Sequence, residues 1–238
     1  NCSAASRLIV QRSLLGHDLV ERLLDALPAL RESANPDLRL PAAPDARQSG
    51  ILDAIRASFI EKGFDGASMQ DLARAAGMSV GNFYRYFPSK DAIIAAIVMR
   101  DLADVEGEFA AIIGSEDPLE TLRQVLRGRI CGTCHTDGAL WAEITAAARR
   151  KPEIGAVVGD LERCIRSYLT TVFAAVTDLP PAEAQRRYGG HASLIMMMVK
   201  ASGMRVPESE SEESDLDELI LRTIDRTLDE IANDASKG

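Results

Sequence analysis

Few residues of this chain have the types and spacing needed to carry out chemistry. Cys131, Cys134 and His135 form a CxxCH motif, the short pattern for covalent attachment of a c-type haem. Attachment also requires a second axial ligand and a haem-binding scaffold, and we identify neither in the sequence. Two thiols three residues apart lie on one helix face or in the turn after it. They could respond to an oxidant, or bind zinc with His135 or Cys164.

The structural role of these cysteines is the more ordinary interpretation. A single CxxC lacks the second pair of ligands expected of a structural zinc site, and free cysteines are common small core residues in a reducing cytoplasm. We therefore favour a core or pocket role and expect no metal site and no cofactor. Redox or metal sensing through Cys131 and Cys134 is the alternative.

Motifs for enzyme chemistry are missing. The sequence has no phosphate-binding glycine loop, no dinucleotide fingerprint, no HExxH and no GxSxG. Its three histidines, His17, His135 and His191, give little from which to assemble a catalytic set. We expect no enzymatic activity and assign no catalytic residue. The alternative to this expectation is a helical enzyme or adaptor in which the helix-turn-helix described next is vestigial.

The stretch from Ser68 to Lys90 has the pattern of a helix-turn-helix. Gly77 stands where the chain leaves the first helix, a position that favours a left-handed backbone and therefore a residue without a Cβ. Ser79 can cap the second helix. The elements that position this unit are a preceding apolar helix, which ends at Gly63, and a long helix that opens at Pro88 and Ser89.

The second helix of this unit would read DNA. Asn82 can make paired hydrogen bonds to adenine, Arg85 can reach guanine or a phosphate, and Val80 can touch a thymine methyl group. Hydroxyl groups and a lysine ammonium suit phosphate oxygens, which position a helix without specifying sequence. The predicted DNA-contacting residues are Ser68, Gln70, Ser79, Val80, Gly81, Asn82, Tyr84, Arg85, Tyr86 and Lys90.

The segment 51–94, ILDAIRASFIEKGFDGASMQDLARAAGMSVGNFYRYFPSKDAII, resembles the DNA-binding domain of the TetR family of bacterial transcriptional regulators. The specific matches are the Gly63-Phe64 turn, the Ser68 cap and the run from Gly81 to Lys90. The resemblance implies that Phe83 is a core residue and that Tyr84 and Lys90 contact phosphate. Close similarity covers about a fifth of the chain.

The resemblance implies an all-α fold with an N-terminal three-helix helix-turn-helix domain and a C-terminal helical ligand-binding and dimerisation domain. We place the first at residues 47–92 and the second at 93–236, after an N-terminal extension at 1–46. The implied partners are a double-stranded DNA operator, a small-molecule effector and a second copy of the chain. The implied function is a repressor that the effector releases from a pseudopalindromic operator.

The effector pocket is implied to lie among the middle helices. Its candidate wall residues are Phe109, Cys134, Trp141, Ile144, Tyr168 and Met197. Trp141 could be a core residue instead, and the run from Met196 to Met198 suits an adaptable pocket as well as a dimer seam.

Prolines and apolar spacing predict the remaining helices. Pro118, Pro152 and Pro181 start three of them, and a capping box of Ser214 and Asp217 is predicted to start the last. The last two helices are implied to pair with their copies in a four-helix interface, unless their apolar stripe closes the chain's own core. The predicted interface residues are Ile195, Val199, Leu216, Ile220, Ile224 and Leu228.

The chain is acidic, with 36 acidic and 27 basic residues and a formal net charge of −9. Residues 47–95 hold six basic and five acidic residues, so the predicted DNA-binding segment is about neutral. Its affinity for DNA would then depend on dimerisation and a local basic patch. No apolar run approaches the roughly twenty residues that span a bilayer, and we expect a cytoplasmic protein without membrane contact.

Residues 1–46 are the least informative part. Apolar residues between Arg12 and Leu30 fall near helical spacing, and a proline-punctuated linker follows at 35–46. The extension could be an arm that touches DNA through Arg7 and Arg12 or packs on the partner subunit. The more ordinary interpretation, which we favour, is a truncated, misassigned or dispensable leader.

Overall fold

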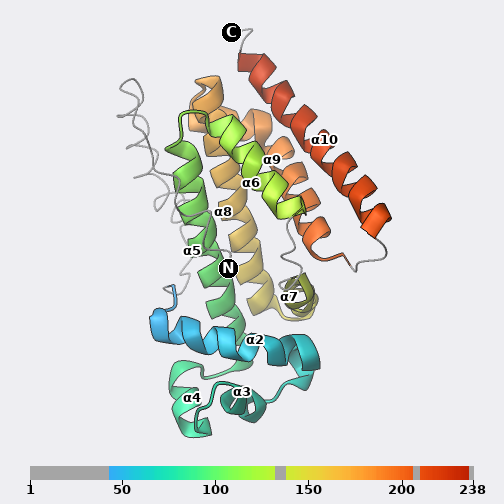
Figure 1. Ribbon diagram of the computed structural model, residues 1–238. Coiled ribbons are helices and arrows are strands. Elements are labelled where there is room, and N and C mark those ends of the chain that lie inside the picture. The colour runs from blue at the N-terminus through green and yellow to red at the C-terminus, as the bar shows by residue number, and fades with distance from the viewer. Residues whose placement is uncertain (1–42, 132–137, 206–209, 236–238) are drawn as a thin grey trace.

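The computed structural model describes residues 43–131, 138–205 and 210–235 of the 238-residue chain. Within these ranges the regular structure consists of nine α-helices, α2 to α10, and no strands (Figure 1). The all-α prediction is confirmed. Most of the predicted N-terminal extension, together with Cys134 and His135, lies outside the described residues.

Three helices form an N-terminal lobe: α2 (Ala46–Gly66), α3 (Met69–Ala75) and α4 (Val80–Tyr86). Asp45 and Gln48 fix the start of α2, since each side chain accepts a hydrogen bond from the other residue's backbone N–H, at 2.7 and 3.1 Å. The lobe closes over a core of buried aromatic and aliphatic side chains that includes Phe59, Phe64, Leu72, Phe83 and Phe87. This small core holds α3 and α4 as one unit on α2.

A long helix, α5 (Lys90–Ile113), leaves the lobe and enters a bundle made with α6 (Pro118–Cys131), α7 (Gly138–Arg150), α8 (Pro152–Thr177), α9 (Pro181–Gly203) and α10 (Glu210–Ala235) (Figure 1). The α8 helix packs on all five of the others, which agrees with the wide apolar face of its sequence. Arg100 ties α5 to α2, because its guanidinium donates to Asp53 Oδ1 at 2.7 Å. One helix therefore belongs to both the lobe and the bundle.

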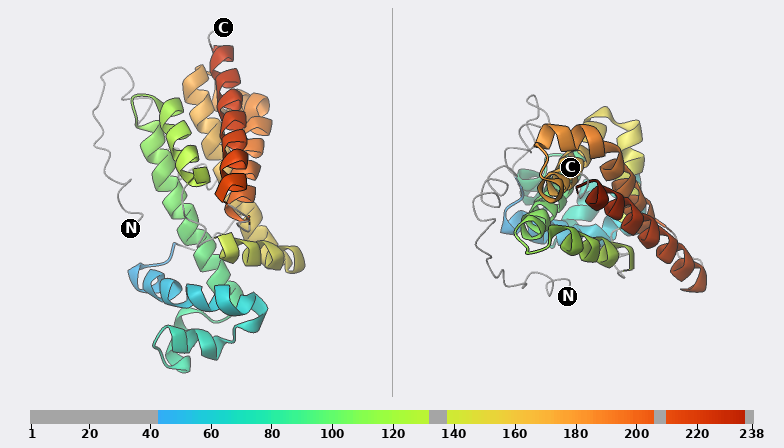
Figure 2. Two further views of the ribbon diagram at one scale, coloured as in Figure 1. Left: turned by 45° about the vertical axis from the view of Figure 1, so that its right-hand side comes forward. Right: turned by 90° about the horizontal axis from the view of Figure 1, so that it is seen from above.

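The α10 helix crosses the outside of the bundle beside α9 and α6 (Figure 2). Arg123 of α6 holds it there by donating to Asp225 at 3.0 Å and to Asp229. Burial alone would lower the pKa of the Arg123 guanidinium, but the bonds to these two carboxylates outweigh it and raise that pKa. The two carboxylates therefore stabilise the cationic form of Arg123.

The predicted start of the last helix is wrong. α10 begins at Glu210, so Ser214 lies inside the helix and does not form an N-terminal capping box with Asp217. Glutamates at 210, 212 and 213 favour this longer helix, because glutamate has high helix propensity and a negative charge is stabilised near a helix N-terminus.

Among the described helices, none combines the length and the apolar run needed to cross a membrane.

Candidate nucleic-acid interface

The first helix of the helix-turn-helix, α3, is capped as the sequence predicts. Ser68 Oγ accepts the Asp71 N–H at 3.1 Å and donates to Asp71 Oδ2 at 2.5 Å. Lys62 and Arg74 also pair with Asp71, at 3.1 and 3.2 Å. The bond from the Ser68 hydroxyl, followed by those from Lys62 and from the Ser68 N–H, holds the pKa of the Asp71 carboxyl well below its usual range.

The turn between the two helices also has the predicted geometry. Gly77 has φ +64°, in the left-handed region, and the N–H of Met78 returns to the carbonyl of Ala73 at 2.9 Å. Ser79 then caps α4 by accepting the N–H of Asn82 at 3.4 Å. Both short helices therefore have defined ends, and the angle between them is fixed by backbone bonds.

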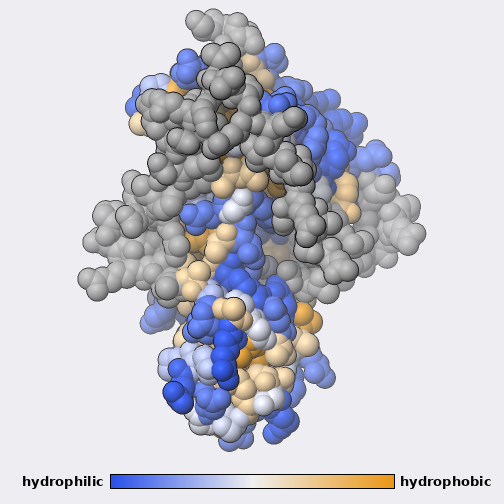
Figure 3. Space-filling view, turned by 60° about the vertical axis from the view of Figure 1, so that its left-hand side comes forward, coloured by the Kyte–Doolittle hydropathy of each residue, from blue (hydrophilic) through white to orange (hydrophobic). Residues whose placement is uncertain are grey.

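The α4 helix is buried on one side and open on the other. Phe83 is fully buried, and its ring centroid lies 5.8 Å from that of Phe87. On the other side Val80 and Tyr84 are 37% and 46% exposed, which is unusual for large side chains with apolar bodies. Other predicted contact residues are also accessible: Gln70, Ser79, Gly81 and Arg85 are exposed, and Asn82 is half-buried. Figure 3 shows hydrophobic and hydrophilic side chains mixed on one side of the lobe.

Tyr86 and Arg47 form a contact that the sequence did not predict. Tyr86 is half-buried against the core, and the Arg47 guanidinium lies 5.7 Å from its ring centroid. Arg47 and Arg85 are exposed, and neither makes an ion pair with another described residue. Arg47 is therefore a candidate for phosphate contact beside α4. No sequence signal marks it, because Arg47 and Tyr86 are distant along the chain.

Lys90 is not a free surface cation. Its ammonium group donates to the carbonyl oxygens of Phe64 and Asp65 at 2.8 and 3.1 Å, and lies 5.1 Å from the centroid of the Phe64 ring. The ammonium has three donors, so one remains for a phosphate oxygen. Lys90 holds the turn before α3, and its predicted phosphate contact stays a prediction.

The predicted effector-pocket residues separate into two groups. Phe109, Ile144 and Tyr168 are buried, with 5.6 Å between the Phe109 and Tyr168 ring centroids. Trp141 is half-buried and donates its indole N–H to Asp101 at 3.0 Å. Met197 is 58% exposed on α9, which corrects its assignment to an interior pocket wall. Cys134 lies outside the described residues.

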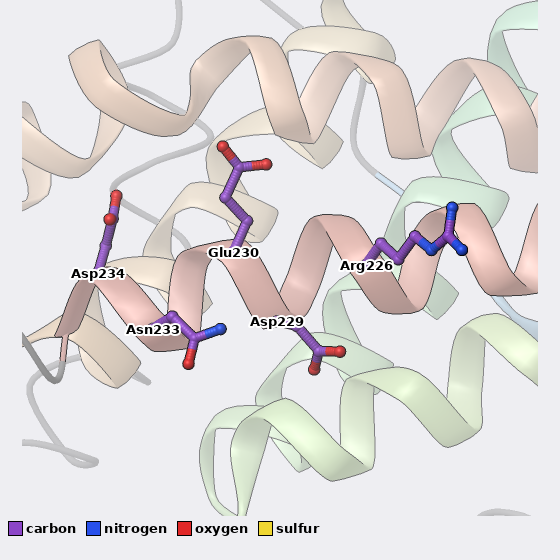
Figure 4. Close-up of a pocket in the computed structure, with 5 residues that line it drawn as sticks. All are labelled: Arg226, Asp229, Glu230, Asn233 and Asp234. Atoms are coloured by element: carbon purple, nitrogen blue, oxygen red, sulfur yellow. The ribbon is translucent and has the colours of Figure 1, made fainter.

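Two hollows in the described part of the chain lie elsewhere. One, of about 190 Å³, lies between the starts of α5 and α8 and is lined by Asp91, Ala92, Ile94, Ala95, Glu153, Ile154 and Val157. A wider one, of about 440 Å³, is lined by five polar residues of α10. Figure 4 shows that Glu230 and Asp234 point to one side of that helix and Asp229 and Asn233 to the other. Neither hollow is lined by a predicted pocket residue, so the effector site stays a prediction.

The cysteines give no support to a sensing site. Cys131 is exposed at the end of α6 and Cys164 is buried in α8. In the part of the chain that the structure describes, no group of three or more histidine, cysteine or acidic side chains is arranged to hold a metal ion.

The predicted dimer residues need a correction. Ile195, Ile224 and Leu228 have exposed fractions of 0%, 1% and 0%, because they face the chain's own bundle. A side chain without accessible surface cannot contact a partner subunit. Val199 and Ile220 are half-buried against the core, and Leu216 is exposed. Leu194, Met197 and Leu219 join Leu216 as the exposed large apolar residues of α9 and α10, which we call the α9/α10 face.

The capped α3–turn–α4 unit on α2, with one face of α4 open, defines a helix-turn-helix protein. The sequence model of the family described as "Bacterial regulatory proteins, tetR family" matches residues 51–97. The HTH-type transcriptional regulator UidR of Escherichia coli (strain K12) is 30% identical over 124 residues, which cover 50% of this chain and 60% of that protein. The HTH-type transcriptional repressor KstR of Rhodococcus jostii (strain RHA1) is 28% identical over 144 residues, which cover 60% and 66%.

Solved structures give the same fold. Salmonella enterica GusR has a TM-score of 0.63 at 22% identity, covering 84% of this chain and 100% of that chain. The ketosteroid transcriptional regulator KstR2 of Mycobacterium tuberculosis has a TM-score of 0.51 at 17% identity, covering 78% and 98%. Residues 51–97 therefore match the model of the TetR family of bacterial regulatory proteins, and the chain as a whole has the fold of these solved structures.

Proposed function

We propose that the protein is a sequence-specific DNA-binding transcriptional regulator that acts as a homodimer and represses from a pseudopalindromic operator. The observation that carries this proposal is the open face of α4. Val80, Tyr84 and Arg85 project from a short helix whose ends are capped and whose other side is buried. A rigid, solvent-facing helix of this kind can enter a major groove and present side chains to base edges. The printed names of relatives such as UidR and KstR agree with this role.

Charge explains why we propose a dimer. Lys62 and Arg74 are paired with Asp71, and Lys90 is held by carbonyl oxygens, so much of the lobe's positive charge is already engaged. Arg47 and Arg85 remain near α4. Two cations per lobe give a weak electrostatic attraction to phosphate, and two lobes on one duplex double it. The α9/α10 face supplies exposed apolar surface for the pairing.

The regulatory step follows from the shared helix α5. An effector that binds the bundle and favours a different angle of α5 would change the distance between the two α4 helices in the dimer. A hundredfold loss of operator affinity requires only about 2.7 kcal/mol of differential binding. The coupling is reciprocal, so operator DNA must weaken effector binding by the same factor.

The test is a random-library selection for DNA bound by the purified protein at a stated, near-physiological salt concentration. We expect one two-fold symmetric motif. The Arg85→Ala variant should bind that motif at least about tenfold more weakly, because a bidentate contact to guanine contributes roughly 1–3 kcal/mol. Arg222→Ala removes the same charge from an exposed site on α10 and is the matched control. A selected motif that Arg85→Ala binds as tightly as the unmodified protein would show that α4 is not the reader.

A further inference from the structure

The last turn of α2 contains a break that only glycine adopts easily. Gly63 has φ +69° and ψ 168°, a backbone region that is essentially restricted to glycine. The break removes the Phe64 N–H from the regular hydrogen-bond ladder of the helix. Gly63, Phe64 and Asp65 lie at this break, in the last turn of α2, and we call them the α2 turn.

A carboxylate from the bundle occupies this break. Glu143 of α7 accepts the Phe64 N–H at 2.9 Å through Oε2, across 79 residues of sequence. The same oxygen would lie 3.2 Å from a Cβ added at Gly63, so the carboxylate is in close contact with the glycine. A bond from a backbone N–H to a charged acceptor is stronger than a neutral one, and the bond is partly shielded from water.

Basic side chains hold the α2 turn from its other sides. Arg150, at the end of α7, pairs with Asp65 at 2.9 Å. The Lys151 ammonium lies 4.9 Å from the Phe64 ring centroid and also pairs with Asp91 of α5 at 2.8 Å. The Glu143 carboxylate differs from these basic groups, because it accepts a hydrogen bond from a backbone N–H inside the break. The turn is thus fixed from α7 by Glu143 and Arg150, and from α5 by Lys90.

The α7 helix packs mainly on α8, and its first residue also touches the end of α9. Gly138, the first residue of α7, approaches the end of α9 so closely that an added Cβ would lie 1.9 Å from the carbonyl oxygen of Gly203. Thr145 Oγ1 lies 3.9 Å from the sulfur of Met204. The α7 helix therefore spans from the end of α9 at one point to the α2 turn at another. Figure 1 shows α7 between the lobe and the bundle.

We infer that Glu143 is a positioning residue: it transmits the placement of α7 to the α2 turn and so sets the orientation of the helix-turn-helix relative to the bundle. The inference rests on the proposed DNA-binding function. The orientation of each lobe determines which spacing between operator half-sites a dimer accepts, so Glu143 should affect this spacing.

The test compares Glu143→Ala, Glu143→Gln and the control Glu116→Ala in the full chain. Glu116 is exposed, so its replacement removes one negative charge outside the junction. We measure hydrogen exchange of the Phe64 amide, and the relative affinities for the selected operator and for versions with one base pair added or removed between half-sites. Glu143→Ala should exchange the Phe64 amide at least about tenfold faster. Its preference for the selected spacing should fall about tenfold, since that preference depends on the lobe being held.

Glu143→Gln keeps an oxygen that can accept the Phe64 N–H and should restore most of both properties, while Glu116→Ala should change neither. A purely structural role predicts a different result, with equal loss of affinity for all three spacings, and that result would overturn the inference. If Glu143→Ala does not fold, Glu143→Asp shortens the side chain and withdraws its carboxylate from the Phe64 N–H, and an unchanged spacing preference in that variant would also overturn the inference. A failure of the proposed function is recognisable separately, because the unmodified protein would then select no DNA.

Discussion

The ammonium group of Lys90 has a structural task in the lobe besides its predicted contact with phosphate. It donates to the carbonyl oxygens of Phe64 and Asp65, which α2 leaves without helical partners. The adjacent lobe residue Tyr84 is different, since it is 46% exposed and its hydroxyl makes no hydrogen bond to another described residue. The two residues were predicted from sequence to contact phosphate in the same way, but only one of them also supports the fold.

Replacing each by alanine should separate these roles. Lys90→Ala leaves two carbonyl oxygens without their donor and should lower the free energy of unfolding by about 1 kcal/mol. It should also lower the affinity for DNA. Tyr84→Ala should lower DNA affinity with little effect on unfolding, because the side chain is 46% exposed and its hydroxyl makes no hydrogen bond to another described residue. Urea unfolding followed by circular dichroism measures the first quantity, and binding to the selected operator measures the second. A Lys90→Ala variant with unchanged unfolding would contradict the structural role.

Local signals explain what could be predicted at this scale. The Ser68 and Ser79 caps and the left-handed Gly77 are set by neighbours within four residues, and the structure confirms all three. The Lys90 bonds span 25 and 26 residues, and the Glu143 bond spans 79. No spacing rule relates residues so far apart, so these contacts required the folded chain.

Among the helices, the starts that depend on proline were predicted and the start that depends on charge was not. Pro118, Pro152 and Pro181 begin α6, α8 and α9, since proline is favoured in a helix's first turn. The start of α10 was predicted at Ser214, but α10 begins at Glu210, because the glutamates before Ser214 also favour helix. The sequence also does not predict where two helices approach each other closely. Gly138 and Gly128 are both helical glycines, yet only Gly138 contacts another element.

Alanine at these two glycines should therefore have opposite effects. Gly138→Ala forces the α7 and α9 backbones apart and should lower the free energy of unfolding by about 1–3 kcal/mol, as overpacking commonly does. Gly128→Ala places its methyl group where no atom lies within 4 Å, and should raise the free energy of unfolding by about 0.5–1 kcal/mol by restricting the unfolded chain. Urea denaturation of both variants measures the difference. Equal stabilities would show that α7 is not lodged against α9.

At the scale of the whole molecule, α9 and α10 each carry two apolar surfaces. Ile195, Ile224 and Leu228 face the bundle, whereas Leu194, Met197, Leu216 and Leu219 remain exposed. Seven large hydrophobic side chains are exposed in the described residues, and these four lie on α9 and α10. Apolar periodicity predicted an apolar stripe on both helices. It could not distinguish their inner from their outer surface, because that depends on which side the rest of the bundle covers.

Charge placed on the outer surface should separate the subunits without unfolding them. The double variant Met197→Glu and Leu219→Glu changes two exposed positions, and two-fold symmetry places both changes in the interface twice. We expect sedimentation velocity to show monomers at concentrations where the unmodified protein is dimeric, with an unchanged helical circular dichroism spectrum and a large loss of operator affinity. Ile60→Glu, at a 41% exposed position on α2, is the control and should remain dimeric. Leu228→Glu should instead unfold the chain, since it buries a charge in the bundle. A dimer that survives the double variant would move the interface away from the α9/α10 face.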